Sequence, residues 1–130
     1  MAKHIHKISV EKLLPIYNKS CELKESFIGI GGWGLPHEYH TMSEIGLFIA
    51  KINNEIEIYG KFNTKVDKIQ QLKDAIGIIN SIIEDIVFEI ALNKKSIFGF
   101  VKLESLRQKR DRYIAIIHVY NSLMNVLEHL

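Results

Sequence analysis

The sequence predicts an all-α protein with the architecture of an antiparallel up-down four-helix bundle. An unbroken apolar seam, with steps of three and four residues, runs from Val66 to Asn93, as in a helix packed lengthwise against others. A second broad apolar face runs from Leu103 to Leu130. Two further helical patterns precede these stretches, and all the connections are short. Residues 1–130 are therefore expected to form a single domain.

Composition sets limits on the setting and the partners. Charged residues make up 25% of the chain and the formal net charge is +2, so any surface for nucleic acid must be local. The single Cys21 excludes an internal disulfide and fits a reducing compartment. Neither a membrane span nor the apolar core of a secretory signal is recognisable. We therefore expect a cytoplasmic protein without a membrane partner.

The first helix is expected between Ser9 and about Phe27, with Ser9 as its N-cap. Pro15 must lie in a first turn or cause a kink, so the regular helix is expected mostly after it. Four glycines and a proline follow in residues 28–36 and end the helix. Their spacing formally matches the dinucleotide-binding motif G-x-G-x-x-G, which needs a strand before it and a helix beginning inside it. Because Leu35-Pro36 follows directly, the stretch is interpreted as a loop and no cofactor is expected.

The second helix begins in the pattern Thr41-Met42-Ser43-Glu44, which is typical of a capping box. Apolar residues at helical spacing then continue to Tyr59, and Gly60 is expected to be the C-cap. A competing interpretation of residues 45–62 is a β-hairpin around Asn53-Asn54, because Glu and Ile alternate from residue 55 to 58. The cap and the longer periodic run favour the helix.

The third helix is expected to be capped by Asn63 or Thr64 and to end before Lys94-Lys95. Residues 97–101 form a short apolar connector for which an extended conformation is one expectation. The last helix, Leu103 to Leu130, carries two adjacent apolar stripes. So much apolar surface on two helices of a small bundle indicates an oligomer.

Six histidines raise the question of a metal site. His4 and His6 lie near the N-terminus, and His37 and His40 lie in the expected turn before the second helix. Zinc requires three or four ligands converging at fixed spacing, and the sequence contains no H-E-x-x-H motif. We interpret these histidines as solvated loop residues and expect no metal.

The densest positive cluster is the run from Arg107 to Arg112, which contains four cations: Arg107, Lys109, Arg110 and Arg112. Clustered arginines suit phosphate contacts, which position a nucleic acid without reading its sequence. A solvated helical surface is the alternative interpretation. No aromatic residue interleaves with these cations, so stacking on single-stranded bases has no support.

Arg112 precedes His118 by six residues, which resembles the Arg-x(4–6)-His motif of HEPN ribonucleases. Those proteins are helical dimers in which the arginine binds phosphate and the histidine serves acid–base chemistry. His118 shares a polar stripe with Ser122 and Asn125, as an exposed functional histidine would. The spacer in this chain, however, is apolar from Ile114 to Ile117. A HEPN-like RNase or toxin remains an alternative function.

Residues 35–92 resemble the four-helix-bundle family of diversity-generating retroelement accessory proteins (accessory variability determinant) and of proteins encoded by intervening sequences in bacterial 23S rRNA genes. Leu35-Pro36 matches the family's turn, Tyr39 to Glu44 its helix start, and residues 45–59 its second helix. Residues 60–63 match the loop that follows, and Leu72, Ala75 and Ile79 are the signature positions of the third helix.

The resemblance implies a non-enzymatic homo-oligomer, a pentamer rather than a dimer, that binds the backbone of RNA or DNA and assists a reverse transcriptase or an RNA-containing complex. Under this hypothesis six cations contact phosphate: Lys94, Lys95, Arg107, Lys109, Arg110 and Arg112. An adaptor that recognises only protein is a third possibility.

Overall fold

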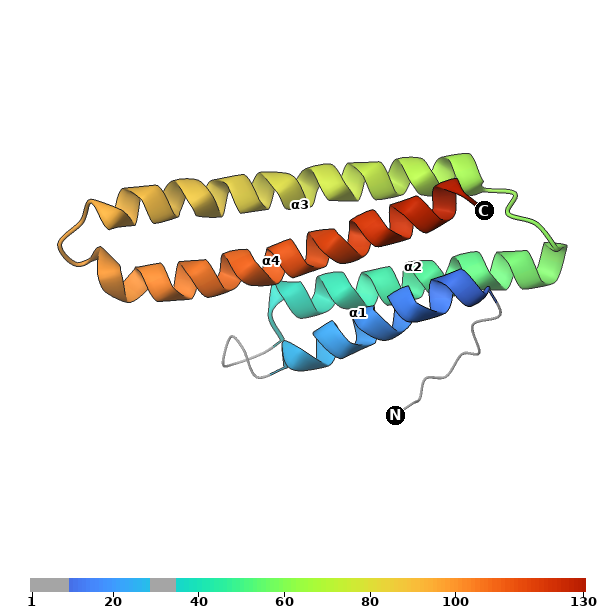
Figure 1. Ribbon diagram of the computed structural model, residues 1–130, viewed down its shortest axis with the longest axis horizontal. Coiled ribbons are helices and arrows are strands. Elements are labelled where there is room, and N and C mark those ends of the chain that lie inside the picture. The colour runs from blue at the N-terminus through green and yellow to red at the C-terminus, as the bar shows by residue number, and fades with distance from the viewer. Residues whose placement is uncertain (1–9, 29–34) are drawn as a thin grey trace.

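The computed structural model describes residues 10–28 and 35–130, and these form four α-helices without a β-strand. The elements are a 3-10 turn at Glu11–Leu13, then α1 (Leu14–Ser26), α2 (His37–Tyr59), α3 (Lys65–Lys94) and α4 (Gly99–Glu128). Consecutive helices run in opposite directions (Figure 1). The predicted all-α four-helix fold is confirmed, and residues 45–59 belong to a helix rather than to a hairpin.

The four helices form two unequal hairpins. The α3/α4 pair has by far the most extensive packing, followed by α1/α2, and the contacts of α2 and α1 with α4 join the two hairpins. Because α3 and α4 each have 30 residues and α1 has only 13, the α1/α2 pair lies alongside only one end of the longer hairpin (Figure 1). The other end of the α3/α4 hairpin extends beyond them.

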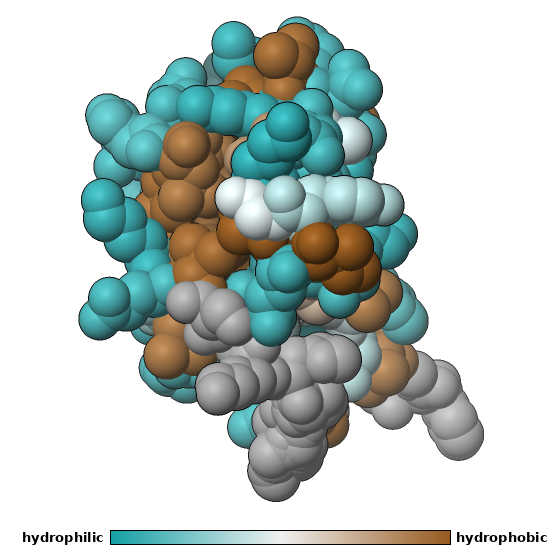
Figure 2. Space-filling view, turned by 90° about the vertical axis from the view of Figure 1, so that its right-hand side faces the viewer, coloured by the Kyte–Doolittle hydropathy of each residue, from teal (hydrophilic) through white to brown (hydrophobic). Residues whose placement is uncertain are grey.

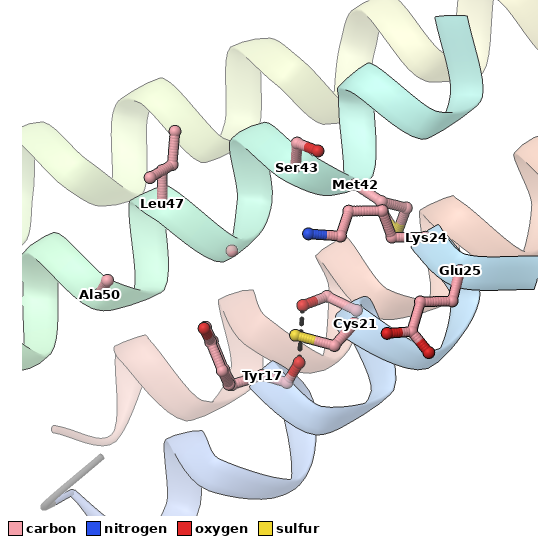
Figure 3. A pocket seen from close by; sticks show the side chains of 10 residues that line it. Tyr17, Cys21, Lys24, Glu25, Met42, Ser43, Leu47 and Ala50 are labelled. Atoms are coloured by element: carbon pink, nitrogen blue, oxygen red, sulfur yellow. Dashed lines mark hydrogen bonds between the residues drawn. The ribbon is translucent and has the colours of Figure 1, made fainter. Parts of the chain in front are cut away.

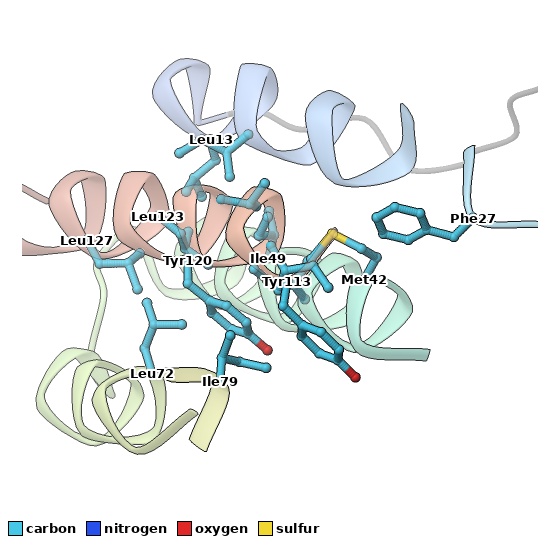
Figure 4. Close-up of a cluster of buried hydrophobic side chains, with 14 of the residues drawn as sticks. Leu13, Phe27, Met42, Ile49, Leu72, Ile79, Tyr113, Tyr120, Leu123 and Leu127 are labelled. Carbon is cyan, nitrogen blue, oxygen red and sulfur yellow. The ribbon is translucent and has the colours of Figure 1, made fainter. Parts of the chain in front are cut away.

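The hydrophobic core lies where all four helices meet (Figure 4). The aliphatic side chains of Leu13, Ile49, Ile52, Ile116, Leu123 and Leu127 are completely buried. Tyr113 and Tyr120 enter the same cluster from α4, and Leu72 and Ile79 enter it from α3. The apolar stripes of α4 therefore pack against α3 and against the α1/α2 pair.

Helix α1 begins at Leu14, later than predicted, after the 3-10 turn. Pro15 lies in its first turn, where a missing backbone N–H costs no hydrogen bond, so the expectation that the regular helix lies mostly after Pro15 is confirmed. Phe27 is its C-cap and is buried. Two sequence expectations lie outside the described residues: the N-cap role of Ser9 and the glycine-rich motif at 29–34.

The predicted start of α2 is wrong. The helix begins at His37, directly after Pro36, so Thr41 lies inside it and cannot be an N-cap. The Thr41 hydroxyl donates instead to the carbonyl of His37, one turn earlier. The predicted end is correct: Gly60 is the C-cap with a φ of 71°, a left-handed conformation that favours glycine.

Thr64 occupies the N-cap position of α3, as predicted, but its side chain does not cap the helix. Its hydroxyl and its backbone N–H both donate to the carboxylate of Glu55 in α2, at 2.5 and 2.9 Å. This contact ties the end of one hairpin to the start of the other.

The expected extended connector at residues 97–101 is also wrong. Helix α4 already begins at Gly99, four residues earlier than predicted. A Cβ atom on Gly99 would lie 1.9 Å from the carbonyl oxygen of Asn93, so only glycine fits this close approach. The tight connection places Ile97, Phe98 and Phe100 at the surface, with exposed fractions between 70 and 84%.

None of the helices in residues 10–28 and 35–130 combines the length and the apolar character that a membrane crossing requires.

Candidate nucleic-acid interface

The six cations predicted to contact phosphate lie on the part of the α3/α4 hairpin farthest from the bundle's end at Gly60. Lys94 is the last residue of α3 and Lys95 follows it, and both are exposed. Arg107 and Lys109 lie two to three turns into α4. Within the described part of the chain these four side chains take part in no ion pair, so their charge is available to a ligand.

Arg110 contacts its sequence neighbour Asp111, with 3.1 Å between Nη2 and Oδ1. The side chain of Asp111 is 67% exposed and that of Arg110 is 34% exposed. An ion pair in such a position contributes little, because water screens it and both side chains lose freedom. Arg110 can therefore exchange Asp111 for a phosphate at small cost.

Arg112 is in a different position. Its Nε donates to Glu38 Oε2 across 2.7 Å, and the two side chains are only 18% and 5% exposed. The pair joins α4 to the first turn of α2. A phosphate would have to leave the buried carboxylate of Glu38 unpaired, which is energetically costly. Of the six predicted side chains, Arg112 is thus the one already committed inside the protein.

A second polar contact lies beside this pair. His37 Nδ1 and Tyr113 Oη are 2.6 Å apart, and the two rings are tilted by 35°. Burial, and then the negative charge of Glu38, raise the pKa of Tyr113 to about 12. The phenol consequently stays neutral and acts as a hydrogen-bonding group. Residues 37–38 and 112–113 together form a polar junction between α2 and α4.

Nothing in the periodicity of the sequence predicts this junction. Glu38 and Arg112 are 74 positions apart, and His37 and Tyr113 are 76 apart. A periodicity analysis treats each helix separately and cannot register helices against each other. The signal in the sequence is the adjacent polar pair His37 and Glu38 directly after Pro36. It could not be interpreted, because the helix was expected to begin at a later residue.

The Arg112–His118 pair of the nuclease alternative is not assembled in one pocket. His118 is exposed and lines a groove between α1 and α4 with Ile16, Lys19 and Ser122. Arg112 lines a separate depression with Ser26 and Phe27 and is paired with Glu38. His118 does lie on the polar side of α4 as predicted, but the arginine does not accompany it.

The histidines at positions 37 and 40 lie in the first turn of α2 and not in a preceding loop, which corrects that expectation. In residues 10–28 and 35–130 there is no group of three or more His, Cys, Asp or Glu side chains able to hold a metal ion. His4 and His6 lie outside the described residues.

A separate groove of about 310 Å³ lies between α1 and α2 (Figure 3). Tyr17, Cys21 and Lys24 line it from α1, and Met42 and Leu47 line it from α2. Burial and the neighbouring Cys21 raise the pKa of Tyr17, so this phenol remains protonated near neutral pH. Among the described residues no histidine lines this groove beside Cys21.

The chain matches no known family model, and neither a curated protein nor a solved structure is significantly similar to it.

Proposed function

We propose that this protein is a non-enzymatic, self-associating accessory protein that binds the backbone of a nucleic acid. The observation that carries the proposal is the group of accessible cations on the α3/α4 hairpin. Lys94, Lys95, Arg107 and Lys109 lack carboxylate partners within the described residues, and Arg110 has only an exposed one. Unpaired cations along one hairpin are suited to successive phosphates, which lie a few ångströms apart.

The proposed complex with a reverse transcriptase, or with another RNA-containing assembly, is supported only by the family resemblance of residues 35–92. The nuclease alternative receives less support, because Arg112 is held by Glu38 and His118 lies in another groove. Nucleic-acid binding without catalysis is therefore the function we propose.

The test is the affinity of the full chain for a fluorescently labelled structured RNA, measured by anisotropy at several salt concentrations. The triple variant Arg107→Gln, Lys109→Gln, Arg110→Gln should weaken binding and reduce the slope of log affinity against log salt by about two to three. Arg112 is left intact, so that a change in folding does not imitate a loss of binding.

A matched control removes three exposed lysines elsewhere, through Lys51→Gln, Lys61→Gln and Lys73→Gln. This variant has the same net charge as the triple variant and should bind nearly as the wild type does. Equal losses in both variants would indicate a diffuse charge effect and contradict the assigned surface. Absence of RNA or DNA binding at low salt would refute the proposal and favour a protein-only adaptor, and RNA cleavage that His118→Ala abolishes would favour the nuclease.

A further inference from the structure

The protruding end of the α3/α4 hairpin, residues 84–107, is unusually apolar at its surface. We call this region the hairpin end. The large apolar side chains exposed on it are Val87, Phe88, Leu92, Ile97, Phe98, Phe100 and Val101. Their exposed fractions lie between 48 and 84%. At the hairpin end two helices stand without the α1/α2 pair that covers their other end (Figure 1), so this surface has no partner within the described chain.

One face of α3 borders α2 near Ala75 and is exposed farther along the helix. Gln71 and Ala75 line a small cavity with Glu44 and Phe48 of α2, so this stripe faces α2. At helical steps of three and four the same stripe continues through Ile78, Ile82, Asp85, Glu89 and Leu92. Ile78 is 62% exposed and Leu92 is 53% exposed. The face of α3 that borders this cavity near Ala75 is therefore open toward the hairpin end.

Charge is distributed unevenly along the hairpin end. Along α3, Glu84, Asp85 and Glu89 lie at the base of the hairpin end and Lys94 and Lys95 lie at its tip, whereas Lys102, Glu104 and Arg107 on α4 show no such separation. None of these eight groups forms an ion pair within residues 10–28 and 35–130. From residue 84 to residue 94 the helix rises by about 15 Å. This separation keeps the opposite charges of one chain apart.

We propose that the hairpin end is the contact surface for a second copy of this chain, in an antiparallel dimer with two-fold symmetry. When the two tips point in opposite directions and α3 of one copy packs against α3 of the other, Lys94 and Lys95 of each copy lie beside Glu84 and Asp85 of its partner. A parallel arrangement would place lysines against lysines. Two uncovered pairs of helices together complete a four-helix bundle, which is how isolated amphipathic helices bury their apolar faces.

The exposed apolar area of the hairpin end approaches what such a contact requires. The three phenylalanines are 64, 81 and 70% exposed, and they present roughly 430 Å² of aromatic surface for burial. The four aliphatic side chains add roughly 250 Å². A standard stable interface buries about 800 Å² on each partner, and the polar rim supplies the remainder. A lipid surface would meet only the tip and would leave Val87 and Phe88 exposed.

This inference rests on the self-association in the proposed function, and it names the surface and the symmetry. It replaces the five-fold assembly implied by the family resemblance with a two-fold pair. In the dimer Lys94 and Lys95 face carboxylates of the partner copy, so the phosphate contacts of the proposed function narrow to Arg107, Lys109 and Arg110, which are the three residues replaced in its test.

The first experiment is light scattering behind a sizing column, on the full chain at micromolar concentration. We expect the mass of two copies for the wild type and of one copy for Phe88→Asp with Phe98→Asp. The matched control is Ile58→Asp with Tyr59→Asp, two side chains that are each 63% exposed near the bundle's other end. Figure 2 shows that end, where hydrophobic areas also occur among hydrophilic ones. This control should remain a dimer, and circular dichroism should show every variant folded.

The second experiment tests the antiparallel arrangement by charge reversal. Lys94→Glu with Lys95→Glu, and separately Glu84→Lys with Asp85→Lys, should each weaken dimerisation by roughly tenfold or more. All four changes in one chain should restore it, because each pair meets its complement on the other copy. Failure of restoration would overturn the antiparallel geometry.

Several results would overturn the proposal. One is a wild-type mass of five copies or of one copy. Another is a double variant, Phe88→Asp with Phe98→Asp, that still has the mass of two copies. A monomer that pellets with phosphatidylserine-containing vesicles would assign the tip to a lipid surface instead. RNA binding is measured on the same samples. A dimer that binds no RNA refutes the nucleic-acid binding of the proposed function and leaves this inference intact, whereas a monomer that binds RNA refutes this inference and the self-association and leaves the nucleic-acid binding intact.

Discussion

The two ends of the α3/α4 hairpin consist of the same two helices and have opposite surroundings. Near Gly60 the hairpin is covered by α1 and α2, and Ile116, Leu123 and Leu127 are completely buried. At the hairpin end Ile97 and Phe98 are more than 80% exposed. Apolar periodicity forms the helices at both ends equally well. What differs is the presence of a covering layer, which periodicity within one helix does not encode.

The largest expected effect is the difference in unfolding free energy lost on truncating an apolar side chain at each end of the hairpin. Leu123→Ala, in the covered end, should lower the free energy of unfolding by about 3 kcal/mol, because it leaves a cavity in a fully buried position. Phe100→Ala, in the hairpin end, should change it by less than about 0.5 kcal/mol when the chain is monomeric. Urea denaturation at low protein concentration measures both. Equal losses would mean that Phe100 is buried within the monomer.

The polar junction marks the boundary between the two ends. Glu38→Gln should cost roughly 3 kcal/mol, because it leaves the mostly buried guanidinium of Arg112 without its carboxylate. The matched control is Asp111→Asn, which removes the exposed partner of Arg110 and should cost no more than about 0.5 kcal/mol. Thermal unfolding by circular dichroism would compare them. Similar melting temperatures for the two variants would contradict the structural role of the junction.

The glycines of the longer hairpin provide a smaller contrast. Gly99→Ala should destabilise the protein by about 2 kcal/mol, because the added methyl group meets the Asn93 carbonyl and forces the connection open. Gly77 is helical and exposed, with no atom within 4 Å of an added Cβ. Gly77→Ala should therefore stabilise the protein by about 0.5–1 kcal/mol. If the denaturation midpoints of Gly99→Ala and Gly77→Ala moved in the same direction, the close approach of Gly99 to the Asn93 carbonyl would be refuted.

The smallest expected effect is on how the stability of the covered end depends on pH. Burial, with Glu38 beside Tyr113 and Glu44 beside Tyr120, raises the pKa of both phenols from 10 to about 12. The unfolded chain ionises these phenols first, so the stability that they contribute is complete below pH 10 and is lost between pH 10 and 12. An absorbance titration of tyrosinate should contain a late component, which Tyr113→Phe with Tyr120→Phe removes. A titration without the late component would contradict the burial of these rings.

Much of the fold could be predicted because it depends on periodicity within each helix. The seam from Ile69 to Ile90 and the stop at Gly60 lie where the pattern placed them. The errors occur where a local pattern competed with chain packing. Thr41 matches a capping box, yet the helix begins at His37, because contacts with α4 fix the first turn of α2.

The candidate site was less predictable for a related reason. Lys94, Lys95, Arg107 and Lys109 could be identified as a positive group from composition alone, since exposed charges need no partner to be recognised. Arg112 belongs to the same run, but its role depends on Glu38 in another helix. The aromatic surface of the hairpin end was likewise hidden, because a connector of five apolar residues could equally have been buried.

The bond between Thr64 and Glu55 has a consequence for how copies of this chain can exchange parts. Residues 60–64 are the only covalent joint between the two hairpins, and the Glu55 carboxylate closes this joint by accepting both Thr64 donors. Those hydrogen bonds lower the pKa of Glu55. They are therefore complete above the ordinary pKa of the carboxyl group and are lost as acid protonates it. Loss of these hydrogen bonds frees only the joint at residues 60–64, because the buried core and the Arg112–Glu38 pair still hold the α1/α2 hairpin on α4. Exchange of that hairpin between copies therefore requires both contacts to break, so Glu38→Gln with Glu55→Gln should form swapped oligomers on a sizing column more readily than Glu55→Gln alone.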